Sequence, residues 1–242
     1  MEKDNKMVKA LILRSAGINC NDETEKGFRM AGAETEQIHV NKLISGEKKL
    51  TDYDILALPG GFSYGDYIAG GSILANQLSV KLRKQMEEFI EQGKVVVGIC
   101  NGFQVLVKTG FLPGDGMKAT LTNNDSGKFE CRWVKLKGSS EMDVPVAHGE
   151  GKFFADNETL DELEENGQVM FRYSSSEYPE NPNGSLRDIA GITNTRGNVI
   201  GLMPHPERHL TYDNHPKEIS KESNEGEGLK FFKNIIERCK TK

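Results

Sequence analysis

The chain has 242 residues, enough for one large domain or two small ones with a sizeable hydrophobic core. Acidic residues outnumber basic ones by 36 to 31, the net charge is −5, and no basic segment is interleaved with aromatic residues, so nucleic-acid binding has little support. The first residues, MEKDNK, are polar, and no apolar run is long enough to span a bilayer. We therefore expect neither a signal peptide nor membrane attachment, and a soluble protein of the cytoplasm.

The four cysteines are scattered along the chain and form no C-x-x-C pair: Cys20, Cys100, Cys131 and Cys239. This arrangement argues against a disulfide framework and against a zinc site, and it suits a reducing compartment. We expect no metal in this chain.

Strand-like and helix-like segments alternate through the first half of the sequence. Short apolar or β-branched runs predict strands at residues 8–13, 37–40, 55–58 and 95–99. Between them, a polar segment at 22–31 and apolar residues at three- and four-residue steps within 67–92 predict helices, and Gly93 ends the second. A further helix begins near Phe103. This alternation favours a mostly parallel sheet with helices on both faces.

After Pro113 the sequence changes to short apolar runs divided by glycine, asparagine, proline and serine. They predict strands at residues 120–124, 129–136, 144–147, 169–173, 189–193 and 199–203. These strands extend the same sheet or form an adjoining β-rich layer, and no linker is long enough to separate two domains. We therefore expect a single domain over residues 1–242, with a polar extension at 1–7, a mobile polar loop at 213–227 and a closing amphipathic helix.

The segment VVVGICNGFQ at residues 95–104 carries the first chemical signal. In the pattern Gly98-x-Cys100-x-Gly102, a cysteine follows a buried strand and has a glycine two positions to either side. This is the spacing of a nucleophile elbow, a tight strand-to-helix turn in which bulky flanking residues would clash. The helix N-terminus behind the turn favours an anionic thiolate. From this segment alone, Cys100 is either a nucleophile or a buried structural cysteine.

A second signal lies where the strand at 55–58 runs into PGGFSYGDY. Paired glycines after a buried strand can direct backbone N–H groups toward a bound anion or carbonyl oxygen. The N–H of Gly61, or of Gly60, and the N–H of Asn101 after the nucleophile would form an oxyanion hole. The alternative is an ordinary strand-to-helix loop. The spacing fits neither a dinucleotide-binding motif nor a P-loop.

Two His-x-Glu motifs offer a base for the nucleophile, His148-Gly-Glu150 and His205-Pro-Glu207, and each follows a predicted strand. In either motif, the histidine could deprotonate the thiol while the carboxylate two residues later orients the ring and stabilises its charged form. The proline of the second motif fixes one backbone dihedral and favours that motif weakly. The residues alone leave both motifs open, together with the alternative of a surface histidine at the end of a strand.

Taken together, GICNGFQ, PGGFSYGDY and MPHPER resemble the triad-type glutamine amidotransferases. More narrowly, GINCNDET, AHGEGKF and NPNGS resemble the glutaminase subunits of phosphoribosylformylglycinamidine synthases, and this similarity covers nearly the whole chain. The resemblance implies a flavodoxin-like three-layer α/β sandwich, with a mostly parallel central sheet and additional strands in the second half.

The resemblance also assigns the residues of a reaction. It makes Cys100 the nucleophile, His205 the base and Glu207 the orienting acid, and so decides between the two His-x-Glu motifs. Four further residues complete the expected site, two through oxyanion-hole N–H groups and two through substrate contacts: Gly61 and Asn101, and Gly60 and Gln104.

The activity implied by the resemblance is hydrolysis of glutamine to glutamate and ammonia. The ammonia would pass through a channel to a large synthetase subunit, with or without a small accessory subunit. That partner would use ATP and magnesium to make formylglycinamidine ribonucleotide in purine biosynthesis, and this chain would hold no cofactor. Two alternatives stay open: a glutaminase subunit of another synthetase, and a stand-alone cysteine hydrolase of the same fold.

Overall fold

The structure, a computed structural model, describes residues 7–216 and 224–240. A nine-stranded sheet runs through it in the order β2-β1-β3-β4-β11-β10-β9-β6-β7. Its first five strands are parallel: β2 (Glu34–His39), β1 (Lys9–Arg14), β3 (Ile55–Leu58), β4 (Val95–Ile99) and β11 (Val199–Leu202). Every residue of β3, β4 and β11 is buried, as expected of strands covered on both faces. The predicted parallel sheet is confirmed.

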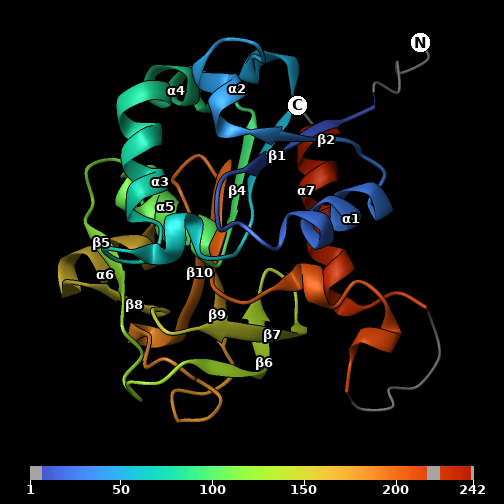
Figure 1. Cartoon of the computed structure of the whole chain (residues 1–242). Coiled ribbons are helices and arrows are strands. Elements are labelled where there is room, and N and C mark those ends of the chain that lie inside the picture. Colours follow the sequence, from blue (N-terminus) through green and yellow to red (C-terminus); the bar gives the residue numbers. More distant parts are fainter. Residues whose placement is uncertain (1–6, 217–223, 241–242) are drawn as a thin grey trace.

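Helices cover both faces of this parallel part (Figure 1). On one face α1 (Asn21–Met30) packs against α7 (Glu227–Lys240), where the Phe28 and Phe232 rings meet edge to face at 5.0 Å. On the other face lie α2 (Val40–Ile44), α3 (Ser72–Gln77), α4 (Arg83–Glu91) and α5 (Asn101–Lys108). Among the described residues, no helix has the length and apolar character needed to cross a lipid bilayer.

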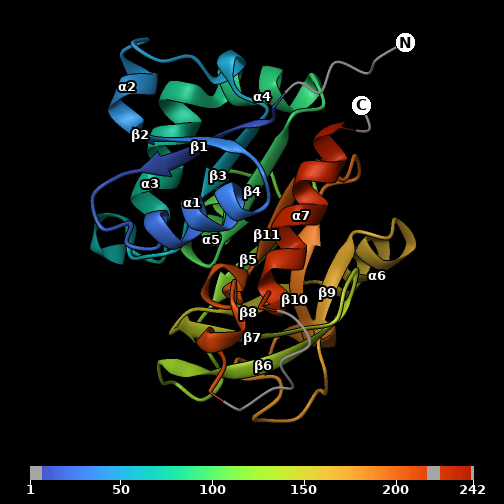
Figure 2. The same ribbon diagram turned by 90° about the vertical axis from the view of Figure 1, so that its right-hand side faces the viewer.

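The second half extends the same sheet through antiparallel strands. These are β10 (Ile189–Thr193), β9 (Val169–Tyr173), β6 (Glu130–Gly138) and β7 (Met142–His148), which lie toward the lower end of the molecule in Figure 2. Beside them, β5 (Ala119–Thr122) and β8 (Lys152–Ala155) form a separate two-stranded sheet, followed by α6 (Asn157–Glu165). Of the two alternatives expected for this half, the structure contains both: most of the strands extend the sheet, and β5 and β8 form an adjoining layer.

Two predictions in the first half are wrong in detail. The helix predicted over 67–92 begins only at Ser72, because Gly71 adopts a left-handed conformation with φ of 73°, and it passes through a π-helical turn at Leu78–Leu82 between α3 and α4. Val40 begins α2 instead of ending β2. In both cases the pattern of apolar residues continues unchanged through a change of backbone conformation, so the pattern alone could not predict that change.

In the second half, β8 and α6 were not predicted. Of the loop predicted at 213–227, the first residues belong to a 3₁₀ turn at Tyr212–Asn214 and the last residue, Glu227, begins α7. Residues 217–223 of that loop and 1–6 of the polar extension lie outside the described residues.

Candidate active site

Four chain segments meet at the carboxyl ends of β1, β3, β4 and β11, where ligands bind in open parallel sheets. The register pairs Ile99 with Leu202, and the Cys100 N–H donates to the Leu202 carbonyl at 2.8 Å. This pairing brings Cys100 beside the segment that holds His205, although the two are far apart in the sequence. A cavity of about 210 Å³ opens here, and both residues line it.

The turn at Cys100 has the tight geometry that the glycine spacing predicts. Cys100 joins β4 to α5 with φ of 51° and ψ of −107°, a backbone conformation that costs on the order of 1–3 kcal/mol outside glycine. The flanking glycines are sterically required. A Cβ at Gly102 would lie 1.9 Å from the Leu58 carbonyl oxygen, and one at Gly98 would lie 2.6 Å from the Gly102 carbonyl oxygen.

His205 and Glu207 form a buried pair next to this turn. The His205 Nδ1 and the Glu207 Oε1 are 2.6 Å apart, and the two residues are 1% and 2% exposed. Within the described part of the chain, His205 Nε2 has no hydrogen-bond partner. Because Glu207 occupies Nδ1, the free Nε2 is the nitrogen available to the Cys100 thiol or to a leaving group.

The electrostatics of the pair suit an imidazole that carries a proton. Burial alone would lower the pKa of His205, but the charges of Glu207 and of Cys100 outweigh burial and hold that pKa well above its ordinary value. A thiolate beside an imidazolium is the reactive form of a cysteine nucleophile. The arrangement can therefore support nucleophilic attack and protonation of a leaving group.

Backbone N–H groups are available for a developing oxyanion. The Gly60 carbonyl accepts bonds from the N–H groups of Asn19 (3.3 Å) and Cys20 (3.2 Å). Since a trans peptide directs its carbonyl and its N–H to opposite sides, the Gly61 N–H points away from that loop, and Gly61 lines the cavity. The Asn101 N–H lies in the first turn of α5, where helical N–H groups have no partner inside the helix.

Gly60 itself is packed between the reacting groups. A Cβ at this position would lie 2.9 Å from the His205 Cε1 and 3.4 Å from the Cys100 Cβ. A side chain at this position would therefore clash with His205, beside Cys100, and substrate contact by Gly60 stays a prediction.

Gln104 lies outside the lining of the cavity. Its Oε1 accepts a bond from the Asn101 Nδ2 at 2.9 Å, and its Nε2 donates to the Glu150 carbonyl at 2.7 Å. The side chain thus ties α5 to the loop after β7, and both of its polar atoms are engaged. Substrate binding by Gln104 stays a prediction.

His148, the competing base, has different surroundings. Its Nδ1 is 3.1 Å from the Asn124 Oδ1, and its Nε2 is 3.4 Å from the Asn183 Nδ2. Burial, with a smaller contribution from the charge of His205, lowers the pKa of His148 to about 4. Glu150 is turned toward Gly70, whose N–H donates to its Oε2 at 3.0 Å. The His148-Gly-Glu150 motif therefore holds a neutral structural histidine next to the site.

Sequence reasoning missed Cys20. This residue follows β1, is 1% exposed, and places its Sγ within 4.8 Å of a ring nitrogen of His205 and a carboxylate oxygen of Glu207. The Arg208 Nη2 donates to the same Sγ at 3.2 Å. The signal available in the sequence was position. Cys20 comes after a predicted parallel strand, and the carboxyl ends of such strands, where Cys100 also lies, meet at one edge of the sheet.

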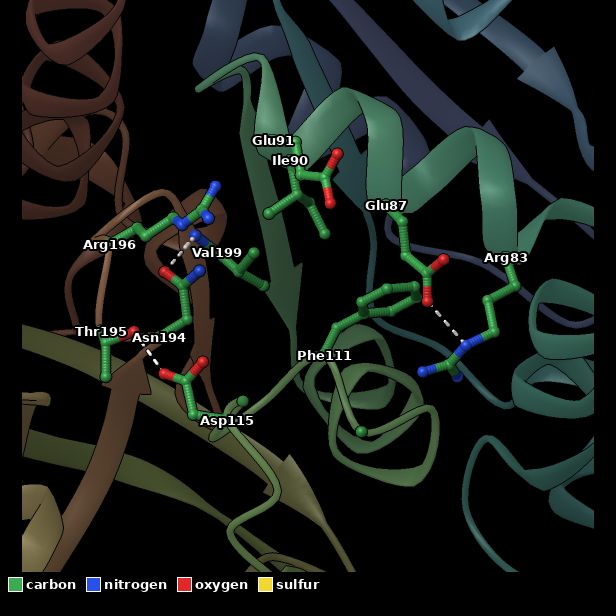
Figure 3. Close-up of a pocket in the computed structure, with 12 residues that line it drawn as sticks. Arg83, Glu87, Ile90, Glu91, Phe111, Asp115, Asn194, Thr195, Arg196 and Val199 are labelled. Carbon is green, nitrogen blue, oxygen red and sulfur yellow. Dashed lines mark hydrogen bonds and ion pairs between the residues drawn. The ribbon is translucent and has the colours of Figure 1, made fainter.

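A second cavity, of about 310 Å³, lies at the opposite ends of the strands (Figure 3). Val199 at the start of β11 lines it, together with Phe111 and residues of α4. Three of its charged side chains are already paired, Arg83 with Glu87 at 2.8 Å and Asp115 with Thr195, and no cysteine or histidine lines it. This cavity therefore offers neither a thiol nor an imidazole, and the cavity at Cys100 and His205 is the candidate active site.

Comparison with known proteins adds three findings. The family model for the CobB/CobQ-like glutamine amidotransferase domain matches residues 7–239. The chain is 46% identical to phosphoribosylformylglycinamidine synthase subunit PurQ of Dehalococcoides mccartyi, over 95% of this chain and 96% of that protein, and 43% identical to PurQ of Methanococcus maripaludis over 95% and 96%. It is also similar to a chain in the structure of PurLQS from Thermotoga maritima, with a TM-score of 0.74 and 30% identity over 94% of this chain and 98% of that one.

Proposed function

The chain belongs to the CobB/CobQ-like glutamine amidotransferase family and, within it, to the PurQ subunits of phosphoribosylformylglycinamidine synthase, and we propose that Cys100, His205 and Glu207 perform its glutaminase reaction. The protein hydrolyses glutamine and supplies the ammonia for synthesis of formylglycinamidine ribonucleotide in purine biosynthesis. One observation supports the residue assignment above all: the strained turn at Cys100 meets a buried His205–Glu207 pair at the cavity.

The first half of the reaction forms a thioester. The Cys100 thiolate attacks the side-chain carbonyl carbon of glutamine, and the oxygen accepts bonds from the N–H groups of Gly61 and Asn101. Each oxyanion donor of this kind is worth about 10²–10³ in rate. His205 gives its Nε2 proton to the departing nitrogen, the C–N bond breaks, and ammonia and a glutamyl thioester result.

The second half releases glutamate. His205, now neutral, removes a proton from a water molecule, and the resulting hydroxide attacks the thioester carbonyl. The C–S bond breaks, glutamate leaves, and Cys100 returns to a thiolate beside a protonated His205. Throughout, Glu207 holds Nδ1 and stabilises the positive charge on the ring.

The ammonia is consumed by a large synthetase subunit, a partnership supported by the similarity to a chain of PurLQS. We propose that ATP and Mg²⁺ bind to that partner and not to this chain, and that the complex works in the cytoplasm. The reaction in this chain needs only the thiol, the imidazole–carboxylate pair and the backbone donors.

The test separates the glutaminase step from synthesis. In the complex with its synthetase, Cys100→Ala should abolish glutamine-dependent formation of formylglycinamidine ribonucleotide and leave ammonia-dependent formation intact. Retained glutamine-dependent synthesis would exclude Cys100 as the nucleophile. Labelling is an independent test: a diazo-ketone analogue of glutamine should modify Cys100 ahead of the exposed Cys131, which serves as the control cysteine. Peptide mapping by mass spectrometry measures the extent of labelling at each residue.

A further inference from the structure

Cys20 connects two parts of the active site that carry different functions. Its N–H donates to the Gly60 carbonyl at 3.2 Å, on the oxyanion side of the cavity. Its sulfur accepts a bond from the Arg208 Nη2 at 3.2 Å, on the side that carries the base, and it lies 3.2 Å from the Asn19 Oδ1. With two polar partners for a buried thiol, Cys20 is held in one position.

Arg208 is the cation next to the carboxylate on which the imidazole depends. The two are consecutive in the chain, and the charge of Glu207 acts on the Arg208 guanidinium. In the described structure the Glu207 Oε1 faces His205, while Oε2 is buried and has no hydrogen-bond partner. A guanidinium is a better partner for a carboxylate than a thiol is, because it can form two parallel charged hydrogen bonds.

We propose that Cys20 is a positioning residue that holds the Arg208 guanidinium on its sulfur and so keeps it from pairing with Glu207. Without this restraint, Arg208 would bond to the free Oε2 and neutralise the charge that stabilises the His205 imidazolium. The inference rests on the proposed role of the His205–Glu207 pair, and it adds a residue outside the triad.

The groups that act on the His205 ring come from four elements. They are Glu207 and Arg208 on its own segment, Cys100 after β4, Cys20 before α1 and His148 at the end of β7. Glu207 and Cys100 raise the pKa of His205, and Cys20 adds a smaller contribution in the same direction. Arg208 would lower it if it moved onto Glu207, because a second cation would share the same carboxylate.

The experiment is an NMR titration of ¹⁵N-labelled histidine in the whole chain, which holds five histidines, with the His205 signal assigned by its loss in His205→Asn. In Cys20→Ala, the His205 midpoint should fall by about one pH unit. Cys20→Ser keeps an acceptor for Arg208 and should stay within about 0.3 units of wild type. Cys20→Ala combined with Arg208→Gln removes the competing cation and should raise the midpoint from that of Cys20→Ala back toward that of wild type.

An unchanged midpoint in Cys20→Ala overturns the proposal. So does a double variant that titrates like Cys20→Ala, because the shift would then come from a repacked core and not from Arg208. Thermal unfolding of each variant checks that the fold is kept. The titration needs no turnover, so its failure is distinct from failure of the proposed glutaminase function, which the Cys100→Ala assay decides.

Discussion

Two histidines in this molecule, one after β11 and one at the end of β7, are each followed by a glutamate two residues later. Both are buried, with His205 1% and His148 3% exposed. Burial by itself lowers the pKa of both rings, yet the pKa of His205 lies well above its ordinary value while that of His148 falls to about 4. Equal burial therefore cannot explain the difference.

The difference comes from what each ring contacts. Glu207 bonds to His205, whereas Glu150 turns away to the Gly70 N–H and leaves His148 between two amide side chains. A carboxylate favours the charged imidazole and amides do not. The same three-residue motif thus yields a ring with a raised pKa in one region and a neutral structural residue in the other.

The largest expected effect is the difference in turnover between a His205 variant and a His148 variant. His205→Asn should lower glutamine-dependent turnover of the synthetase complex by about 10²–10⁴, because general acid–base catalysis is lost. His148→Asn should lower turnover far less, because the two nitrogens of that ring face Asn124 and Asn183 and not Cys100. Steady-state kinetics with glutamine and, as control, with ammonia measures both. A more severe loss in His148→Asn would reverse the assignment of the two motifs.

Substitution of the two glutamates extends the comparison and should have smaller effects on catalysis. Glu207→Gln keeps a hydrogen-bond acceptor for the ring but removes the negative charge, and it should lower kcat/KM for glutamine by about 10–10². Glu150→Gln is the matched control and should change kcat/KM by less than about threefold, since its side chain meets only a backbone N–H. Equal losses in the two variants would contradict a role for the Glu207 charge.

How much of the fold and of the site could be predicted from the sequence depends on how far apart in the chain the interacting residues lie. The elbow was predictable because two glycines and a β-branched run report on local backbone, and β4 has the bounds that the sequence indicated. The choice between the histidines was not, because it depends on the pairing of β4 with β11 and on Asn124 and Asn183. The resemblance to a family supplied that choice.

Cys20 is a second residue whose place in the site could not be predicted from local sequence. In the sequence it is a cysteine at the start of a helix, which is indistinguishable from a residue of the hydrophobic core. Its partner Arg208 is close only because β1 and β11 end at the same edge of the sheet. Contacts between residues this far apart in the chain leave no local pattern to read.

The last expected effect concerns stability and tests the neutral state of His148. A histidine is protonated below about pH 6.5 in the unfolded chain, whereas in the folded chain the pKa of His148 is about 4. The unfolded state therefore binds the extra proton between these values, and the stability contributed by neutral His148 is fully present above pH 6.5 and is lost as the pH falls toward 4. Between pH 7 and pH 5 this loss is on the order of 2 kcal/mol in the free energy of unfolding.

Urea denaturation of wild type and His148→Asn at the two pH values isolates this contribution, because other titrating groups are common to both proteins. Asparagine can still bond to Asn124 and Asn183 but cannot gain a proton, so the variant should lose less stability than wild type between pH 7 and pH 5. At pH 7 the variant should be the less stable of the two, because the smaller side chain leaves part of the buried site unfilled. Parallel losses in the two proteins would show that His148 is already charged in the fold, and the contrast with His205 would then have to rest on geometry alone.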